Sequence, residues 1–182
     1  MSTKVVTGKV RFSYAQVFQP KSVNGGAEKY SVTLLIPKTD KKTVKAIKEA
    51  IKEATEEGIE SKWKGKKPAN LWNPLRDGDE EKDLDENPEY EGMYFVSCKS
   101  DRRPSIVDKD LNEIIDPDEF YSGCWGRASI NFYAFNNTTN GVAAGLNHLQ
   151  KLKDDTRFGG SGSTAEEDFG DGFEDDDEDN DF

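Results

Sequence analysis

Apolar and polar residues alternate along two segments of the chain, and this period of two is typical of β-strands with one buried face. The first segment, residues 5–18, places on one face the side chains of Val6, Val10, Phe12 and Tyr14. The second segment, residues 126–136, places on one face Ala128, Ile130, Phe132 and Ala134, and on the other Arg127, Ser129, Asn131, Tyr133 and Phe135. We expect the more apolar face of the second segment to be buried, and Phe12 of the first segment to be a core residue.

Shorter segments add further strands and one helix. Strands are predicted at residues 29–36, 93–99, 105–107, 113–115 and 142–146, with Pro, Gly, Asn and Asp between them as turn residues. Thr39 or Asp40 is suited to cap a helix that runs to about Glu57, and Gly58 is expected to end it. Five or more strands with one helix inserted after the first hairpin predict a mainly β fold, an OB-fold-like small β-barrel.

The C-terminal segment differs in composition from the rest of the 182-residue chain. Residues 159–182 are Gly and Ser followed by Asp and Glu, and their apolar residues are only Ala165, Phe169, Phe173 and Phe182. So few apolar side chains cannot offset the entropy that is lost when a chain is ordered. The sequence therefore predicts two parts, an OB-fold domain over residues 1–158 and a disordered acidic tail over residues 159–182 that ends in Phe.

Charge is also unevenly distributed along the chain. The net charge is −11, yet residues 166–181 alone hold 11 acidic residues and no basic ones. Residues 1–67 carry 15 basic and 7 acidic residues, whereas residues 77–91 carry 9 acidic residues against Lys82 alone. A basic surface, an acidic loop and an acidic tail are therefore expected in one molecule.

Several classes of protein do not fit this composition. No apolar run approaches the roughly 20 residues of a membrane span, and the first residues lead directly into a strand, so neither a membrane protein nor a secretory precursor is expected. Two cysteines, Cys98 and Cys124, and the single histidine, His148, are too few for a disulfide framework or a metal cage. We expect a cytoplasmic protein without a metal or another cofactor.

No enzyme motif is complete in the sequence. Residues 58–67 resemble a phosphate-binding loop, but the spacer is too long and no Ser or Thr follows the lysines. A calcium-like pattern that begins at Asp108 has Glu113 where the turn requires Gly. The acidic residues come in runs rather than as a pair in an apolar pocket. The sequence therefore predicts a protein with no catalytic residues.

Aromatic and cationic residues are interleaved along the predicted strands. Such surfaces bind single-stranded nucleic acid, because bases stack on aromatic rings while cations follow the phosphates. The candidate binding residues are Lys9, Arg11, Tyr14, Lys21, Trp72, Tyr94, Lys99, Arg102, Arg103, Trp125, Arg127 and Tyr133.

Two further sets of residues have alternative interpretations. A barrel needs aromatic core residues, and we assign this role to Phe12, Phe95 and Phe132. The predicted helix carries a stripe of lysines, at Lys41, Lys45, Lys48 and Lys52. This stripe is interpreted as a solvated face, with a nucleic-acid contact as the alternative.

The acidic tail has an aromatic pattern as well as a charge. Phe169, Phe173 and Phe182 are spaced among its carboxylates, which a purely solubilising segment would not require. A tethered polyanion reaches a high effective concentration beside a basic groove and is expected to compete there with nucleic acid. Its last residues, Asp179, Asp181 and Phe182, are candidates for partner binding. The alternative is a tail that confers only solubility.

Several motifs together resemble a known family. They are residues 7–14 (TGKVRFSY), 29–32 (KYSV), 74–79 (PLRDGD), 120–124 (FYSGC), 126–135 (GRASINFYAF) and 145–147 (GLN). Over residues 3–157 the sequence is similar to the phage and prophage family of single-stranded-DNA-binding proteins with an OB barrel and an acidic tail. The resemblance implies an OB barrel, sequence-independent binding of single-stranded DNA, and a role in phage DNA replication or recombination in the host cell cytoplasm.

Our primary hypothesis is a non-enzymatic protein that coats single-stranded DNA and whose tail binds phage or host replication and recombination proteins. The alternative is an RNA-binding protein or a general nucleic-acid chaperone on the same barrel, because stacking does not distinguish the two sugars. A third hypothesis, from a different class, is an acidic adaptor that binds basic proteins through the tail. The sequence leaves open whether the protein is a monomer or a homodimer.

Overall fold

The computed structural model describes residues 2–22 and 26–158, so the predicted acidic tail lies outside the described residues. The strands form one sheet and are β1 (Lys4–Val6), β2 (Val10–Ser22), β3 (Glu28–Pro37), β4 (Arg76–Asp77), β5 (Met93–Ser100), β6 (Ser105–Val107), β7 (Trp125–Asn136) and β8 (Asn140–Lys153). The helical elements are α1 (Lys41–Ser61), the short α2 (Gly78–Glu81) and the 3-10 turn η1 (Pro88–Tyr90). None of these described helices is long and apolar enough to cross a membrane.

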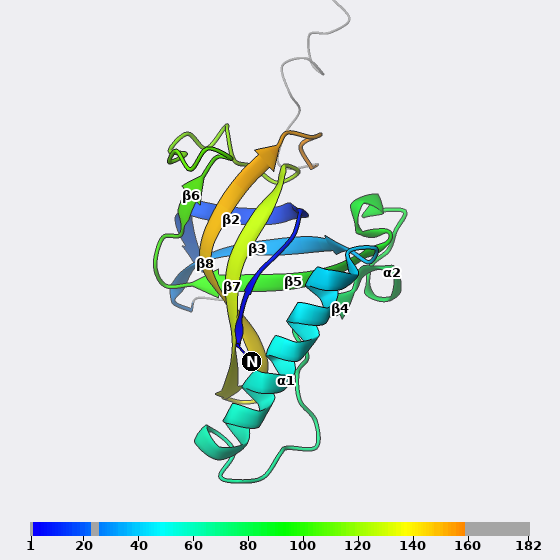
Figure 1. Cartoon of the computed structure of the whole chain (residues 1–182), viewed down its shortest axis with the longest axis vertical. Coiled ribbons are helices and arrows are strands. Elements are labelled where there is room, and N and C mark those ends of the chain that lie inside the picture. The colour runs from blue at the N-terminus through cyan, green and yellow to red at the C-terminus, as the bar shows by residue number, and fades with distance from the viewer. Residues whose placement is uncertain (1, 23–25, 159–182) are drawn as a thin grey trace, which may run out of the picture.

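Five strands pair in a ring (Figure 1). In order around it, β2 pairs with β3, β3 with β5, β5 with β8, β8 with β7, and β7 with β2. All of these pairings are antiparallel except β5 with β8. The β7–β2 and β5–β8 pairings are short, with two residue pairs each, and they close the sheet on itself. This arrangement confirms the predicted mainly β, small-barrel fold with one main helix after the first hairpin.

The interior of the barrel follows from the alternation along its strands. On β7 the four residues predicted to be buried are buried, namely Ala128, Ile130, Phe132 and Ala134. On β2 the buried ring of Phe12 packs against Phe120, with ring centres 4.8 Å apart. Burial of these apolar side chains supplies the main stabilisation of the fold.

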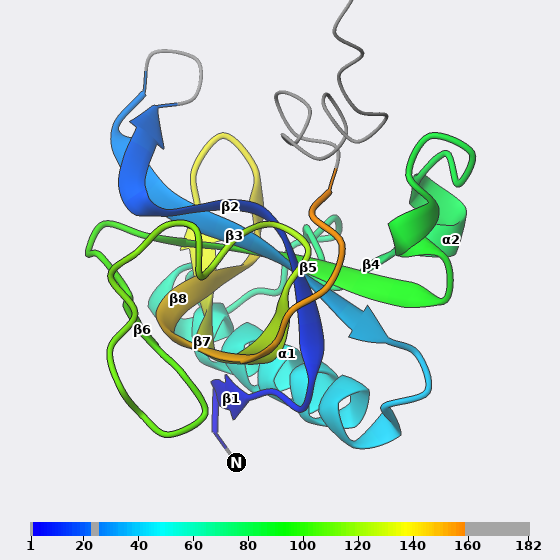
Figure 2. The same cartoon turned by 90° about the horizontal axis from the view of Figure 1, so that it is seen from above.

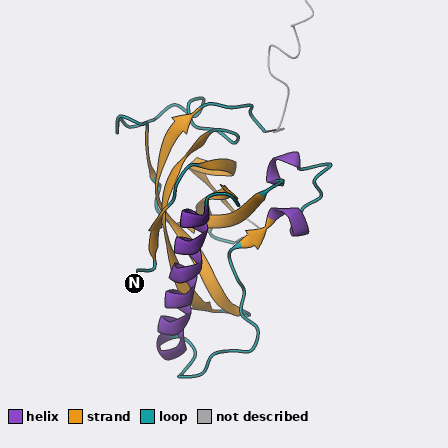
Figure 3. Cartoon of the chain, turned by 45° about the vertical axis from the view of Figure 1, so that its right-hand side comes forward, coloured by secondary structure: helices purple, strands orange, loops and turns teal. Residues whose placement is uncertain are grey.

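The helix α1 covers one side of the barrel, packing against β7, β1 and β8 (Figure 3). It begins after Asp40, whose carboxylate accepts a hydrogen bond of 3.1 Å from the backbone N–H of Thr43. The helical period predicts an apolar stripe of Val44, Ile47, Ile51 and Ala54, of which all but the partly buried Ile51 are buried, together with Ala50.

Gly58 does not end α1, contrary to the sequence prediction, and the helix continues to Ser61. A Cβ atom at Gly58 would lie 2.4 Å from the Cβ of Ala134 and 2.8 Å from the ring of Trp63. The glycine therefore permits a close approach between the helix and the barrel rather than a left-handed turn.

The segment predicted as one strand over residues 5–18 is two strands, separated at residues 7–9. The backbone N–H of Gly8 donates a 2.9 Å hydrogen bond to the hydroxyl of Thr43 in α1, which turns the chain out of the ladder. Tyr14, a candidate binding residue, alternates with Phe12 in the sequence, yet Phe12 is buried and Tyr14 is 60% exposed. The pairing of β2 with β3 shifts register after Ser13, and Tyr14 has a φ of 49°, so the alternation is interrupted there.

Two later elements also differ from the predicted ones. The last strand spans residues 140–153 rather than 142–146, because it pairs with β7 along its length and with β5 and β6 on its other edge. The expected strand at residues 113–115 is reduced to a single bridge between Val107 and Glu113.

Candidate nucleic-acid interface

A groove of about 680 Å³ lies on the outer surface of β5, β7 and β8, beside residues 72–82. We term it the aromatic groove. It is lined by Trp72, Pro74, Arg76, Glu81, Lys82, Phe95, Ser97, Lys99, Tyr133, Phe135, Asn137, Ala143 and Ala144. The five ring strands, in chain order, are β2, β3, β5, β7 and β8. The third strand is therefore β5, and Asn137 lies in the loop between the fourth strand, β7, and the fifth, β8. OB barrels bind oligonucleotides on the face of their second and third strands and on the neighbouring loops.

Four aromatic rings line this groove. Trp72 and Tyr133 are about half exposed, at 51% and 46%, whereas Phe95 and Phe135 are partly buried. The residue opposite Tyr133 on β8 is Ala143, whose methyl group is too small to cover the tyrosine ring. The groove thus offers flat apolar surfaces to a planar ligand.

The backbone of Trp72 is fixed to the barrel. Its N–H donates to the carbonyl of Asn140 at 3.0 Å, and its carbonyl accepts from the N–H of Val142 at 3.1 Å. Between Asn140 and Val142 lies Gly141, where a Cβ atom would be 2.5 Å from the Cβ of Trp72. This close approach holds the indole at the edge of the groove without a regular strand around it.

Cations stand beside these rings. The guanidinium of Arg76 lies 4.1 Å from the ring centre of Trp72 and donates two hydrogen bonds, of 2.9 and 2.6 Å, to a carboxylate oxygen of Glu81. The ion pair orients the guanidinium over the indole. Lys99 projects from β5 on the same face as Phe95 and is exposed.

Tyr90 supports the groove from behind. Its ring is buried and meets the ring of Phe95 edge to face, with centres 5.2 Å apart. Burial raises the pKa of Tyr90 to about 12, so the phenol is neutral at pH 7. The ammonium of Lys82 lies 5.1 Å from both ring centres and adds a positive charge at this end of the groove.

More cations gather beyond Lys99, where β2 and β3 extend past the barrel (Figure 2). Lys21 on β2 lies opposite Lys29 on β3, and Lys29 forms an ion pair with Asp101. The hydrogen bond to Asp101 raises the pKa of Lys29. Arg103, in the turn after β5, lies with its guanidinium 5.8 Å from the ring centre of Phe18.

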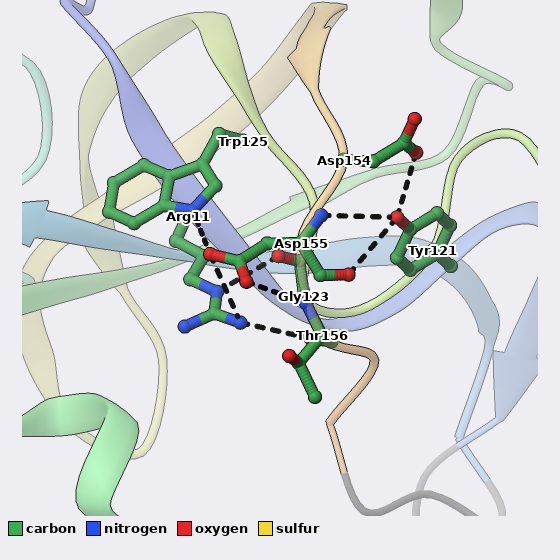
Figure 4. Close-up of polar contacts among 7 residues, drawn as sticks. All are labelled: Arg11, Tyr121, Gly123, Trp125, Asp154, Asp155 and Thr156. Carbon is green, nitrogen blue, oxygen red and sulfur yellow. Dashed lines mark hydrogen bonds and ion pairs between the residues drawn. The ribbon is translucent and has the colours of Figure 1, made fainter.

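A second cluster of predicted residues has mainly internal contacts (Figure 4). Nε of Arg11 donates to the carbonyl of Gly123 and an Nη atom donates to the carbonyl of Thr156, both at 2.9 Å. The guanidinium also lies 4.3 Å from the ring centre of Phe158. Arg11 therefore attaches the segment after β8 to the barrel.

Trp125 takes part in the same attachment. Its indole N–H donates to the carboxylate of Asp155 at 2.8 Å, and this hydrogen bond is the main cause that lowers the pKa of Asp155. Lys9 lies with its ammonium 5.6 Å from the centre of the indole. Nearby, the hydroxyl of Tyr121 donates to Asp154 at 2.8 Å. We term residues 154–158, held by these side chains, the C-terminal latch.

Two other predicted residues lie away from the aromatic groove. Arg127 projects from β7 and donates from Nε to the carbonyl of Thr7 at 2.8 Å, which joins β7 to the chain after β1. Tyr94 lies on the opposite face of β5 from Phe95, and the ammonium groups of Lys38 and Lys48 lie 5.2 and 5.8 Å from its ring centre.

The structure brings three of the twelve predicted binding residues into the groove, namely Trp72, Lys99 and Tyr133. It places the other nine elsewhere: Lys9, Arg11, Tyr14, Lys21, Tyr94, Arg102, Arg103, Trp125 and Arg127. The predicted tail residues Asp179, Asp181 and Phe182 lie outside the described residues.

Sequence reasoning did not include Arg76, Lys82 and Phe135 among the candidates and assigned Phe95 to the core. A signal for Phe95 and Phe135 was present, because each shares its strand face with a candidate, Lys99 and Tyr133 respectively. No periodic pattern pointed to Arg76 or Lys82, since Arg76 lies in the two-residue strand β4 and Lys82 directly follows the four-residue helix α2.

The buried cysteines belong to the core. Cys98 and Cys124 are unpaired, and desolvation raises the pKa of both thiols. Within residues 2–22 and 26–158, no three His, Cys, Asp or Glu side chains gather in a group that could hold a metal ion.

A small barrel with an open groove lined by aromatic rings and cations defines the class of oligonucleotide-binding barrel proteins. The family model described as "Enterobacter phage Enc34, ssDNA-binding protein" matches residues 3–182, and the chain belongs to this family.

Individual relatives agree with this assignment. Protein p50 of Acyrthosiphon pisum secondary endosymbiont phage 1 is 31% identical over 179 residues, which cover 92% of this chain and 93% of p50. The single-stranded DNA-binding protein from bacteriophage Enc34, solved in complex with ssDNA, is 31% identical with a TM-score of 0.75, covering 86% of this chain and 90% of that one. The bacteriophage T7 protein gp2.5 is 18% identical with a TM-score of 0.61 over 97% of each chain, a likeness of fold alone.

Proposed function

We propose that the protein binds single-stranded DNA without sequence preference and acts in phage DNA replication and recombination in the host cell cytoplasm, as a binding protein rather than an enzyme. The observation that carries this proposal is the aromatic groove, in which four rings and three cations, Arg76, Lys82 and Lys99, face one surface. Membership of the Enc34 family and the likeness to a relative described in complex with ssDNA support it.

The chemistry of the groove explains how such binding would work. Bases would stack on the exposed rings of Trp72 and Tyr133, and stacking contributes about 1–3 kcal/mol per base. The ammonium groups of Lys82 and Lys99 would follow the phosphates. Every base has a flat face, so binding through stacking and charge tolerates any sequence.

A titration with labelled oligonucleotides tests the proposal. Trp72→Ala should weaken the binding of an oligo-dT strand by about 5- to 150-fold, the equivalent of 1–3 kcal/mol. Leu111→Ala is the matched control, because Leu111 is also exposed, at 72%, but lies outside the groove. Equal affinities of both variants would exclude the groove as the binding site, and tighter binding of an RNA strand of matching sequence would favour an RNA-binding function.

We further propose that the acidic tail modulates DNA binding and recruits phage or host replication proteins through Asp179, Asp181 and Phe182. If the tail occupies the groove half of the time, its deletion should tighten DNA binding about twofold by mass action. Phe182→Ala, which keeps all 11 carboxylates, should leave DNA affinity unchanged. Identical affinities of the intact and tail-less proteins in low salt would contradict the modulation.

A further inference from the structure

Tyr14 is an exposed aromatic residue with an unusual backbone conformation in the middle of a strand. It lies in β2, it is 60% exposed, and its φ is 49°, in the left-handed region that favours glycine. Ser13 pairs with Thr33 and Gln16 pairs with Ser31, so two residues of β2 lie opposite one residue of β3. The strand therefore carries a β-bulge at Tyr14.

The bulge places the ring of Tyr14 on the outside of the barrel. By strict alternation Tyr14 would share the inner face of β2 with Phe12, which is buried. The extra residue of the bulge reverses this orientation. The left-handed conformation is unfavourable for a residue with a Cβ atom, and a mostly exposed ring gains little from burial in return. Backbone strain of this kind is concentrated at binding sites.

The neighbours of Tyr14 hold the bulge in place. The N–H of Ala15 donates a 3.0 Å hydrogen bond to the hydroxyl of Ser122, in the segment before β7. The buried Ser13 is hydrogen-bonded through its hydroxyl to the phenol of Tyr90. Burial is the main cause that raises the pKa of Tyr90, and the phenol of Tyr14 adds to this effect, so the two phenols are neighbours. The ring of Tyr14 thus projects from a fixed backbone.

The strands β2, β3 and β5 lie side by side and connect Tyr14 with the aromatic groove (Figure 1). Ser13 pairs with Thr33, and Thr33 pairs with Ser97 in the lining of the groove. The hydroxyl oxygens of Thr33 and Ser97 are 3.2 Å apart. Two strand spacings, about 10 Å, separate Ser13 from Ser97. Tyr14, the next residue after Ser13, is therefore near the edge of the groove.

The surface between the groove and Tyr14 suits a nucleic-acid strand. It carries a second row of paired residues, with Lys99 on β5, Ser31 on β3 and Gln16 on β2. Lys99 and Gln16 are exposed and Ser31 is partly buried. None of these three side chains is a carboxylate, and the ammonium of Lys99 can pair with a phosphate.

We propose that Tyr14 is a second stacking site for the DNA strand, reached from the aromatic groove across the outer surface of β5, β3 and β2. A base would stack on the ring of Tyr14 while the phosphates pass Lys99. This subsite rests on the proposed binding of single-stranded DNA and adds to it a contact outside the groove.

Oligonucleotides of two lengths test the subsite separately from the groove. Sites on OB folds span about 4–16 nucleotides, so an oligo-dT strand of about 4 nucleotides should fit in the groove alone, whereas one of about 12 also reaches Tyr14. Tyr14→Ala should weaken binding of the longer strand about 5- to 150-fold, the equivalent of one stacking contact of 1–3 kcal/mol. Binding of the shorter strand should change less than about twofold. Tyr14→Phe keeps the ring and should bind both strands like the unchanged protein.

Tyr14→Gly separates stacking from a structural role of the ring. Glycine adopts the left-handed conformation without strain. This variant should therefore unfold at about the same temperature as the unchanged protein, yet bind the longer strand as weakly as Tyr14→Ala does. A lower unfolding temperature together with equal loss of affinity for both strands would mean that Tyr14 supports the fold, and the proposal would be wrong.

Leu111→Gly is the matched control. Leu111 is also exposed, at 72%, and has a positive φ of 69°, but it lies outside the groove in a turn where Asp108 accepts hydrogen bonds from the N–H groups of Asp110 and Asn112. Its replacement relieves the same strain and should leave both affinities unchanged. A loss of DNA binding in this variant as large as that of Tyr14→Gly would contradict a specific contact at Tyr14.

Trp72→Ala, titrated with the same two strands, distinguishes a failure of the subsite from a failure of the proposed function. If Trp72→Ala weakens the binding of both strands and Tyr14→Ala weakens neither, the groove binds DNA and only the subsite is wrong. If Trp72→Ala leaves both affinities unchanged, the groove does not bind the strand, and a path from the groove to Tyr14 is excluded as well.

Discussion

Neighbouring residues of β7 have different surroundings and therefore different expected roles. Phe132 is 2% exposed in the barrel core, whereas Tyr133 is 46% exposed in the aromatic groove. Phe132→Ala should lower the free energy of unfolding by about 3–5 kcal/mol, since a large core cavity is left. Tyr133→Ala should leave thermal unfolding unchanged but weaken oligo-dT binding about 5- to 150-fold, because one stacking platform worth about 1–3 kcal/mol is lost.

Tyr133→Phe is the control for this pair of variants, because it keeps the ring and removes only the hydroxyl. It should bind the strand nearly as well as the unchanged protein. Melting curves and binding isotherms on all three variants decide the outcome. A stable Phe132→Ala protein together with an unfolded Tyr133→Ala protein would mean that the two faces of β7 are reversed.

The sequence predicted these two roles because alternation along a regular strand fixes which side chains point inward. It did not predict the register shift in β2 that interrupts the alternation after Ser13. Nor did it indicate that Arg11 bonds to backbone carbonyls 112 and 145 positions further along the chain. Contacts over such separations depend on the closed barrel rather than on any local pattern.

At the scale of elements, the packing of α1 on the barrel depends on the absence of a side chain at Gly58. Gly58→Ala would place a methyl group 2.4 Å from Ala134 and 2.8 Å from Trp63. Overpacking of this kind costs about 1–3 kcal/mol, more than the gain in helix propensity of up to about 1 kcal/mol. Chemical denaturation should therefore show a less stable protein.

Glu57→Ala provides the comparison for Gly58→Ala, because residue 57 is an exposed neighbour in the same helix. It should change the free energy of unfolding by less than about 0.5 kcal/mol, as is usual for surface positions. A Gly58→Ala protein more stable than the unchanged one would show that the helix and barrel do not meet as closely as described.

The C-terminal latch should make stability depend on pH. Hydrogen bonds from Trp125 to Asp155, and from Lys151 and Tyr121 to Asp154, lower the pKa of both carboxyl groups below their ordinary value. The unfolded chain therefore binds these protons more tightly than the folded one. The stabilisation is present above about pH 4 and is lost as the pH falls through the lowered pKa values.

Urea denaturation at pH 7, 4 and 3 measures this effect. The free energy of unfolding should decrease on acidification, and it should decrease less in the double variant Asp154→Asn, Asp155→Asn. The remaining decrease would come from other carboxyl groups with lowered pKa, such as Asp79 and Asp108. Parallel pH profiles of the two proteins would contradict a stabilising role for the latch.

The sequence predicted the elements better than their connections. The number and spacing of strands, with one helix after the first hairpin, were sufficient for a small barrel. The division of residues 5–18 into β1 and β2 was not predictable, because it depends on a hydrogen bond from Gly8 to Thr43 in α1. The short helical elements α2 and η1 were not predicted either, because residues 61–91 have no hydrophobic periodicity.

At the scale of the whole molecule, charge and stacking together should set the salt dependence of binding. Each phosphate neutralised on a single strand contributes a slope of about −0.7 to a plot of the logarithm of affinity against that of salt concentration. Arg76 is paired with Glu81, so the two lysines assigned to phosphates, Lys82 and Lys99, predict a slope of about −1.4 from the groove alone. A flat plot between low and physiological salt would contradict the neutralisation of phosphates by these cations.

If single-stranded DNA lies in the aromatic groove, photochemical cross-linking should locate the strand there. An oligo-dT strand irradiated on the full protein, followed by peptide mass spectrometry, identifies the residues that contact bases. We expect adducts at Trp72 and Tyr133, with Phe95 and Phe135 as further positions, and none above background at Trp125. Adducts confined to Trp125, Tyr14 or the lysines of α1 would contradict this location of the strand.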